Sequence, residues 1–271
     1  MTLADGSPLH RSRAGRGGGS LLLSLPAGLA LGLLLPGCSP GEKSLPPMPP
    51  PVQARPAQRP VSPRLEAIYQ AALSQGNEDL QAGRFSDAVM EFSKAMGVHP
   101  DNPVLLRVLG TAHARNNDLT RARRSLEASI RLDPRVPGAH YELAQVALAG
   151  GDLDTAEQEA RRTVLLDPDN PTAHELVGVV EYRQGRVETA LTTLEPVAAR
   201  DPTRVQTQFI LGLCYQHLKE YQKARDAFQK AVRNDPRHRE AYFNLGKVLA
   251  ILGDEEGARR ANAEFLRLQN E

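Results

Sequence analysis

The stretch DPRVPGAHYELAQVALAGGDLDTAEQEARRTVLLDPDN, residues 133–170, contains two Asp-Pro pairs spaced 34 residues apart. The same spacing recurs along most of the chain, with prolines at Pro100, Pro134, Pro168, Pro202 and Pro236. A fixed period of this length is typical of proteins built from one repeated helical unit. Placing each proline at position 32 defines six units: 69–102, 103–136, 137–170, 171–204, 205–238 and 239–271.

Small residues recur at two positions of the unit. Position 20 is alanine in all six units, and position 8 is glycine in every unit except the third, which has Ala144. Larger apolar residues recur at positions 7 and 24, and turn-forming residues such as Gly150-Gly151-Asp152 lie between positions 14 and 18. Two antiparallel helices approach closely only where their side chains are small. Each unit is therefore predicted to be a helix–turn–helix hairpin.

The unit resembles the tetratricopeptide repeat (TPR), which has large apolar residues at positions 4 and 5, Leu at 7, Gly at 8, Ala at 20 and Pro at 32. The last unit follows this pattern closely through Ala241-Tyr242-Phe243-Asn244-Leu245-Gly246. The resemblance covers residues 69–268. It implies an all-α fold, a right-handed TPR solenoid of six helix–turn–helix repeats that binds proteins and is not an enzyme.

The amino terminus has the pattern of a secretory signal. Three arginines precede the 15-residue apolar run 21–35, which ends in Leu35-Pro36-Gly37-Cys38. This ending resembles a bacterial lipobox and predicts a signal peptide at residues 1–37, with Cys38 as the lipidated first residue of the mature chain. Two alternatives are an uncleaved anchor helix and ordinary cleavage that releases a soluble protein.

A proline-rich segment separates the expected lipid from the repeats. Nine of the 25 residues in 39–63 are proline, which favours an extended polyproline II tether over residues 38–64. The six-repeat domain is expected to occupy residues 65–271. Ser39, which follows the cysteine, favours the outer membrane by the lipoprotein sorting pattern, so we expect a lipid-anchored protein on its periplasmic face.

Composition argues against several other functions. Lys and Arg number 33 against 32 Asp and Glu, and no basic stripe is present, so nucleic acid is not an expected partner. No nucleophile motif, phosphate loop or metal-ligand spacing occurs, so no cofactor, metal or small-molecule substrate is expected. His140 and His174, both at position 4, and Cys214, in the middle of a helix, are interpreted as packing residues.

The concave face of a TPR stack is built chiefly from positions 2, 5, 9 and 12 of the first helices. An aromatic, weakly polar groove there would accept an extended or helical segment of a protein partner. The alternative is that these side chains serve packing alone. The candidate groove residues are Tyr141, Tyr182, Gln206, Phe209, Leu213, Gln216, Phe243 and Lys247.

Lipobox, spacer and six consecutive repeats together resemble the type IV pilus pilotin group, which includes the myxobacterial social-gliding lipoprotein. The resemblance implies a secretin subunit as partner and a role in assembling the pilus pore. It is a likeness of architecture and contains no binding-site motif. The alternative is an envelope scaffold that recruits or regulates cell-wall enzymes.

Overall fold

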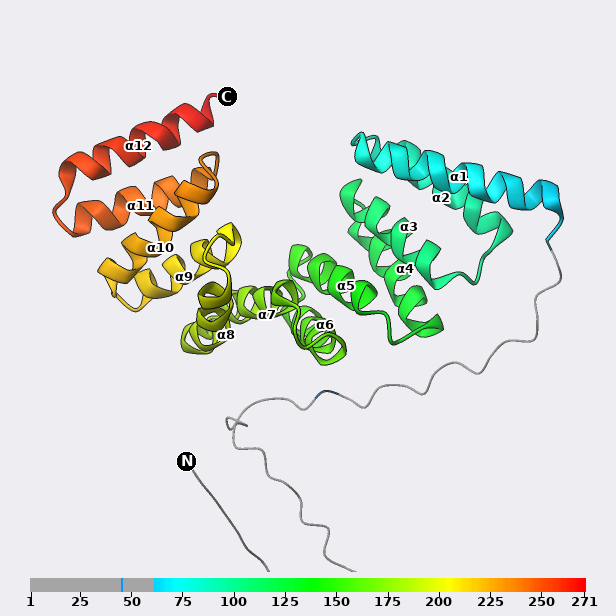
Figure 1. Cartoon of the computed structure of the whole chain (residues 1–271), viewed down its shortest axis with the longest axis horizontal. Helices are drawn as coiled ribbons and strands as arrows, with labels where there is room; N and C mark the ends of the chain where they lie inside the picture. Colours follow the sequence, from blue (N-terminus) through cyan, green and yellow to red (C-terminus); the bar gives the residue numbers. More distant parts are fainter. Residues whose placement is uncertain (1–44, 46–60) are drawn as a thin grey trace, which may run out of the picture. The chain divides into compact units, whose positions relative to one another are not determined.

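The computed structural model describes residue 45 and residues 61–271, and within these residues all regular structure is helical. The helices follow one another in chain order (Figure 1). They are α1 (Pro63–Gln81), α2 (Phe85–Val98), α3 (Pro103–Arg115), α4 (Leu119–Leu132), α5 (Pro137–Ala149), α6 (Leu153–Leu166), α7 (Pro171–Arg183), α8 (Val187–Arg200), α9 (Val205–His217), α10 (Tyr221–Asn234), α11 (Arg239–Ile251) and α12 (Glu255–Gln269).

Each odd-numbered helix packs against the even-numbered helix that follows it, and each hairpin packs against the next. This arrangement confirms the predicted solenoid of helix–turn–helix repeats. Helices α3, α5, α7, α9 and α11 also contact one another in succession. The first helices of successive repeats therefore line one shared face of the stack.

The glycines at position 8 allow the two helices of a hairpin to approach. A Cβ atom placed on Gly76 would lie 2.7 Å from the ring of Phe92, and one on Gly212 would lie 2.5 Å from the ring of Phe228. Both rings are fully buried at position 24. A larger residue at position 8 would push the helices apart, so the recurrence of glycine there has a direct packing cause.

The turn inside each hairpin has one residue in the left-handed backbone region, at position 15. This residue is glycine in four repeats, whereas Asn117 and Lys219 adopt positive φ angles of 61° and 62°. Glycine adopts this conformation without a steric penalty, and a lysine does not. The hairpin turn thus imposes the same geometry even where the sequence lacks glycine.

Helix α1 begins at Pro63, two residues before the expected start of the domain at residue 65. Proline is accepted at the first helical position because the amide there has no partner within the helix, so this residue belongs to the helix and not to the tether. The Ser62 side chain caps the helix by accepting from the Leu65 amide at 3.4 Å.

The predicted signal peptide, Cys38 and all of the tether except Leu45 and residues 61–64 lie outside the described residues. Among the helices of residues 61–271, none combines the length and the apolar character that a membrane span requires.

Candidate partner-binding groove

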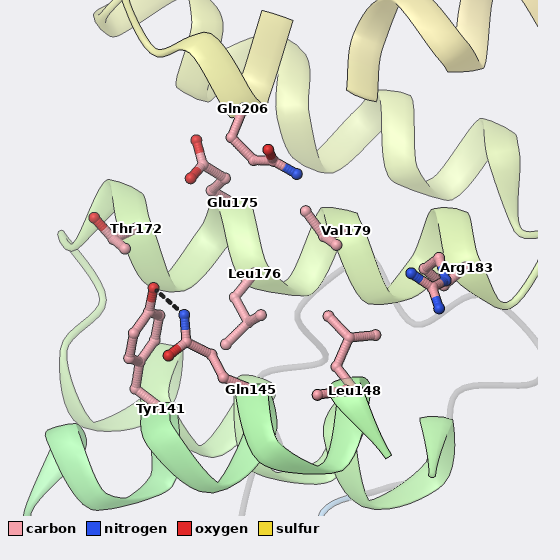
Figure 2. Close-up of a pocket in the computed structure, with 10 residues that line it drawn as sticks. Tyr141, Gln145, Leu148, Thr172, Glu175, Leu176, Val179, Arg183 and Gln206 are labelled. Carbon is pink, nitrogen blue, oxygen red and sulfur yellow. Dashed lines mark hydrogen bonds between the residues drawn. The ribbon is translucent and has the colours of Figure 1, made fainter. Parts of the chain in front are cut away.

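A pocket of about 500 Å³ opens on the shared face of the first helices, where α5, α7 and α9 meet (Figure 2). We call it the groove pocket. A volume of this size is within the usual range for sites that receive a ligand or an inserted side chain. Its lining residues are Tyr141, Gln145, Leu148, Ala149, Thr172, Glu175, Leu176, Val179, Arg183 and Gln206.

The middle of the groove pocket is aliphatic and its two ends are polar. Leu148 of α5 and Leu176 and Val179 of α7 provide the apolar part, and Leu176 is almost completely buried. Figure 2 shows Tyr141 and Arg183 at opposite ends. If a partner segment places an apolar side chain on the aliphatic middle, the adjacent residues of that segment lie close to hydrogen-bonding groups at both ends of the pocket.

At one end, the Tyr141 hydroxyl accepts a hydrogen bond of 3.0 Å from the Gln145 amide. Burial raises the pKa of Tyr141, and the nearby carboxylate of Glu175 raises it further. The phenol therefore keeps its proton at neutral pH. Because its oxygen acts as an acceptor towards Gln145, the hydroxyl hydrogen is available to donate to a carbonyl of a bound segment.

Glu175 is held by residues at the start of α9. Arg204 donates to both carboxylate oxygens at 3.1 and 3.2 Å, and the buried Thr207 hydroxyl donates to one of them. Arg204 also donates to Thr172 at 3.1 Å. These contacts neutralise the carboxylate and join the fourth repeat to the fifth, so Glu175 acts mainly as an interrepeat clamp.

Arg183, in the last turn of α7, supplies the net charge of the groove pocket. Its side chain is exposed, and within residues 61–271 it forms no ion pair. The carboxyl-terminal end of α7 carries a partial negative charge from its free carbonyl groups, and this charge favours a cation at this place. An exposed guanidinium beside an aliphatic surface also suits a carboxylate on a partner segment.

The structure brings only part of the predicted groove set together. Tyr141 and Gln206 line the groove pocket. Tyr182, Phe209 and Leu213 instead pack against the core cluster built around Leu194, Ile210 and Leu211. Phe209 in particular places its ring 4.6 Å from that of His238 and 6.0 Å from that of Phe228.

The other three predicted residues lie further along the stack. Phe243 is 40% exposed, and its ring contacts that of Phe265 at 5.2 Å. The Lys247 ammonium lies 4.5 Å from the centre of the Phe243 ring. Gln216 is half-buried on α9 and does not line the groove pocket. Tyr141, Phe209 and Phe243 all occupy position 5, but their surroundings differ: Tyr141 lines the groove pocket, whereas Phe209 packs against Phe228 and His238.

Several lining residues of the groove pocket were not singled out from the sequence. Thr172, Glu175, Gln145 and Leu148 occupy positions 2, 5, 9 and 12, the positions that the repeat register assigns to this face. Taking every residue at these four positions in the third and fourth repeats, whatever its chemistry, identifies them. Arg183 is at position 13, outside the four positions that the repeat register assigns to this face.

The packing interpretation of the two histidines agrees with their contacts. His140 is buried, with Nδ1 2.5 Å from Glu159 Oε2 and Nε2 3.0 Å from the carbonyl oxygen of Pro134. His174 places Nε2 2.8 Å from the Pro168 carbonyl oxygen. No group of three or more potential metal ligands occurs among the described residues. Both imidazoles thus join the first helix to the turn that precedes it.

The sequence pattern of the tetratricopeptide repeat matches residues 73–137, 107–171, 141–204, 178–237 and 220–270. The chain belongs to the tetratricopeptide repeat family. TPR repeats typically form protein-interaction scaffolds and are not themselves catalytic. The groove pocket therefore lies on the face that successive TPR first helices create.

Three solved TPR structures show the same fold. PilF of Pseudomonas aeruginosa is 14% identical, with a TM-score of 0.66 over 76% of this chain and 93% of that one. MamA of Desulfovibrio magneticus RS-1 is 24% identical, with a TM-score of 0.55 over 62% and 95%. YrrB, described as a TPR protein with an unusual peptide-binding site, is 19% identical, with a TM-score of 0.51 over 66% and 93%. No curated protein sequence matches the chain.

Proposed function

We propose that this protein is a lipoprotein of the outer membrane, on its periplasmic face, that captures a segment of a secretin subunit and promotes assembly of the type IV pilus pore. The observation that carries the binding role is the groove pocket: an aliphatic floor between a phenol donor and an exposed arginine. Such a surface suits an extended or helical protein segment that carries an apolar residue with a carboxylate nearby.

The membrane part of the proposal depends on the sequence around Cys38. A lipidated cysteine followed by a proline-rich tether would hold the repeats near the bilayer while leaving the groove accessible. Each buried methylene of an acyl chain contributes about 0.8 kcal/mol, so several chains anchor a protein stably. The secretin part depends on the combination of lipobox, spacer and six repeats, and the likeness to PilF supports it at the level of fold alone.

The proposal is tested in a strain from which the gene is deleted. We expect secretin monomers to persist while the detergent-resistant multimer, detected by immunoblot without boiling, is lost together with surface pili. The wild-type gene should restore the multimer. Cys38→Ser should not, because the precursor then lacks its lipid and its membrane position.

The groove is tested by Arg183→Glu, which reverses the charge of the groove pocket at an exposed site. We expect a normal amount of folded protein and a reduced amount of secretin multimer. Arg200→Glu is the matched control, since Arg200 is also an exposed arginine in the last turn of a helix but does not line the groove pocket. Normal multimers in the deletion strain would refute the secretin role. Cell-wall enzymes that copurify with the anchored protein would then favour the alternative scaffold.

A further inference from the structure

The first helices of the last three repeats carry two exposed cations that lack a carboxylate partner. Arg183 of α7 and Lys247 of α11 form no ion pair within residues 61–271. Every carboxylate on these helices is paired with an arginine: Glu175 with Arg204 at 3.1 Å, Glu181 with Arg161 at 3.1 Å and Glu240 with Arg239 at 3.2 Å. Helix α9, which lies between α7 and α11 in the stack, contains no Asp, Glu, Lys or Arg. This part of the shared face therefore has positive charge that its own carboxylates do not neutralise.

Lys247 is held against an exposed aromatic ring. Its ammonium lies 4.5 Å from the centre of the Phe243 ring, and Phe243 is 40% exposed. Lys247 precedes the last turn of α11, so the partial negative charge at the helix end does not account for its position. A cation–π contact orients an ammonium group without neutralising it. The charge of Lys247 is thus presented beside an apolar surface.

An apolar path joins the two cations. Position 9 is Val179 in α7, Leu213 in α9 and Lys247 in α11, and the first two of these side chains are half-buried. Because successive first helices contact one another, the side chains at position 9 follow one another across the shared face. Arg183 lies one helical turn beyond Val179, and both line the groove pocket (Figure 2). We call Arg183, Val179, Leu213 and Lys247 the groove strip.

The spacing of the groove strip suits an extended segment. Packed helices are about 8–10 Å apart, so two such intervals place the cations roughly 16–20 Å from each other. An extended chain advances about 3.3 Å per residue and presents every second side chain to the same side. A segment with carboxylates about six residues apart therefore spans the strip. Two alternate side chains between them would lie over Val179 and Leu213.

Charge argues against the proline-rich segment of this chain as the occupant. Residues 39–60 contain one carboxylate, that of Glu42, against Lys43, Arg55 and Arg59. A segment with net positive charge is repelled by the two cations of the groove strip. The complementary occupant is a segment of another protein with an excess of carboxylates.

We propose that the groove binds an extended, acidic protein segment in which two carboxylates pair with Arg183 and Lys247. Two aliphatic side chains between these carboxylates cover Val179 and Leu213. The inference rests on the proposed binding role of the groove and specifies the chemistry of the segment that it takes. Because each ion pair is exposed, the pairs contribute more to the choice of partner than to total affinity.

The test uses the full chain and the synthetic peptide Asp-Ser-Leu-Ser-Leu-Ser-Asp with both ends blocked, in isothermal titration calorimetry. Alternate side chains of this peptide give the order acid, aliphatic, aliphatic, acid. We expect it to bind about fivefold more tightly than Asn-Ser-Leu-Ser-Leu-Ser-Asn, since each exposed ion pair contributes modestly. Added salt should reduce this preference. The isomer Asp-Asp-Ser-Leu-Ser-Leu-Ser, whose carboxylates are adjacent, should bind more weakly than the first peptide. Equal binding of the three peptides, or binding of none, would overturn the proposal.

Variants of the two cations make the test specific. Lys247→Gln and Arg183→Gln should each reduce the preference for the Asp peptide over the Asn peptide to about twofold. Lys230→Gln is the matched control, because it removes one positive charge at an exposed site on α10, away from the first helices, and should keep the full preference. Circular dichroism checks that each variant is folded. An unchanged preference in both Lys247→Gln and Arg183→Gln would contradict the proposal.

A charge exchange tests the pairing directly. Lys247→Glu should bind a peptide with Lys in place of one Asp more tightly than the wild type binds that peptide. These measurements involve no secretin, so normal multimers in the deletion strain would refute the secretin role without affecting them. A dimer of the chain in sedimentation velocity that Lys247→Gln dissociates would assign the groove strip to a second copy and would also overturn the proposal.

Discussion

A methyl group added to Gly178 would lie 2.4 Å from Cγ of Leu194, so the glycine at position 8 and the leucine at position 24 occupy one shared space. The third repeat divides the corresponding space differently, with Ala144 at position 8 and Ala160 at position 24, both fully buried. A larger residue at position 8 is thus accompanied by a smaller one at position 24, as expected for two side chains that compete for one space.

This relationship predicts a strong coupling between the two sites. Gly178→Ala alone should destabilise the chain by about 1–3 kcal/mol through overpacking. Leu194→Ala alone should cost about 2–5 kcal/mol because it leaves a cavity. The double variant reproduces the pair of the third repeat, so its loss of unfolding free energy should be clearly smaller than the sum of the two single losses. The measurement is urea denaturation followed by circular dichroism. Strict additivity would show that the two sites do not share this space.

Lys219 gives a second prediction. Its φ angle of 62° places a side chain in the left-handed region, which costs about 1–2 kcal/mol relative to an ordinary conformation. Glycine removes this penalty but loses more backbone entropy on folding, by about 0.5–1 kcal/mol. Lys219→Gly should therefore stabilise the chain by roughly 0.5–1 kcal/mol. The converse change, Gly185→Lys, should lower the thermal midpoint, and a rise there would contradict the backbone argument.

Protonation of Asp152 should lower the free energy of unfolding at acidic pH. A hydrogen bond from Arg123, and then contacts from Thr155, lower the pKa of Asp152 from 3.8 to about 2. Because the folded pKa lies below the unfolded one, the stabilisation is fully present above pH 4 and is lost as the pH falls towards 2. Asp152→Asn should flatten this part of the curve of unfolding free energy against pH. The comparison is Asp254→Asn, at another helix cap, whose side chain accepts from the Gly257 amide in the first turn of its own helix.

Cys214 should be chemically inert in the folded chain. Its side chain is fully buried, and burial raises the pKa of the thiol to about 12. Since the thiolate is the reactive form, iodoacetamide at pH 8 should label Cys214 only after denaturation. Peptide mass spectrometry distinguishes this thiol from Cys38. Rapid labelling of Cys214 under native conditions would mean that α9 opens locally.

The period of 34 residues was enough to predict the fold because the same small residues meet in each hairpin. The turn at Lys219 was the least visible in the sequence, since no glycine or asparagine occupies position 15 there. That turn is imposed by the helices on either side of it. Local sequence signals therefore described most of the turns but not this one.

The candidate site was predicted less completely than the fold. The register assigned positions 2, 5, 9 and 12 to one face, and Tyr141 and Gln206, at two of these positions, line the groove pocket. Phe209 could not be assigned from its position, because whether its ring points outwards depends on His238 at the end of the same repeat, with which it packs.

Each helix of the stack packs mainly against helices that are adjacent or next but one in the chain. The contacts therefore join residues close in sequence, and a low contact order generally gives fast folding. A repeat can acquire its structure as soon as its neighbour is available, so folding can begin at any repeat and spread from there along the stack in both directions.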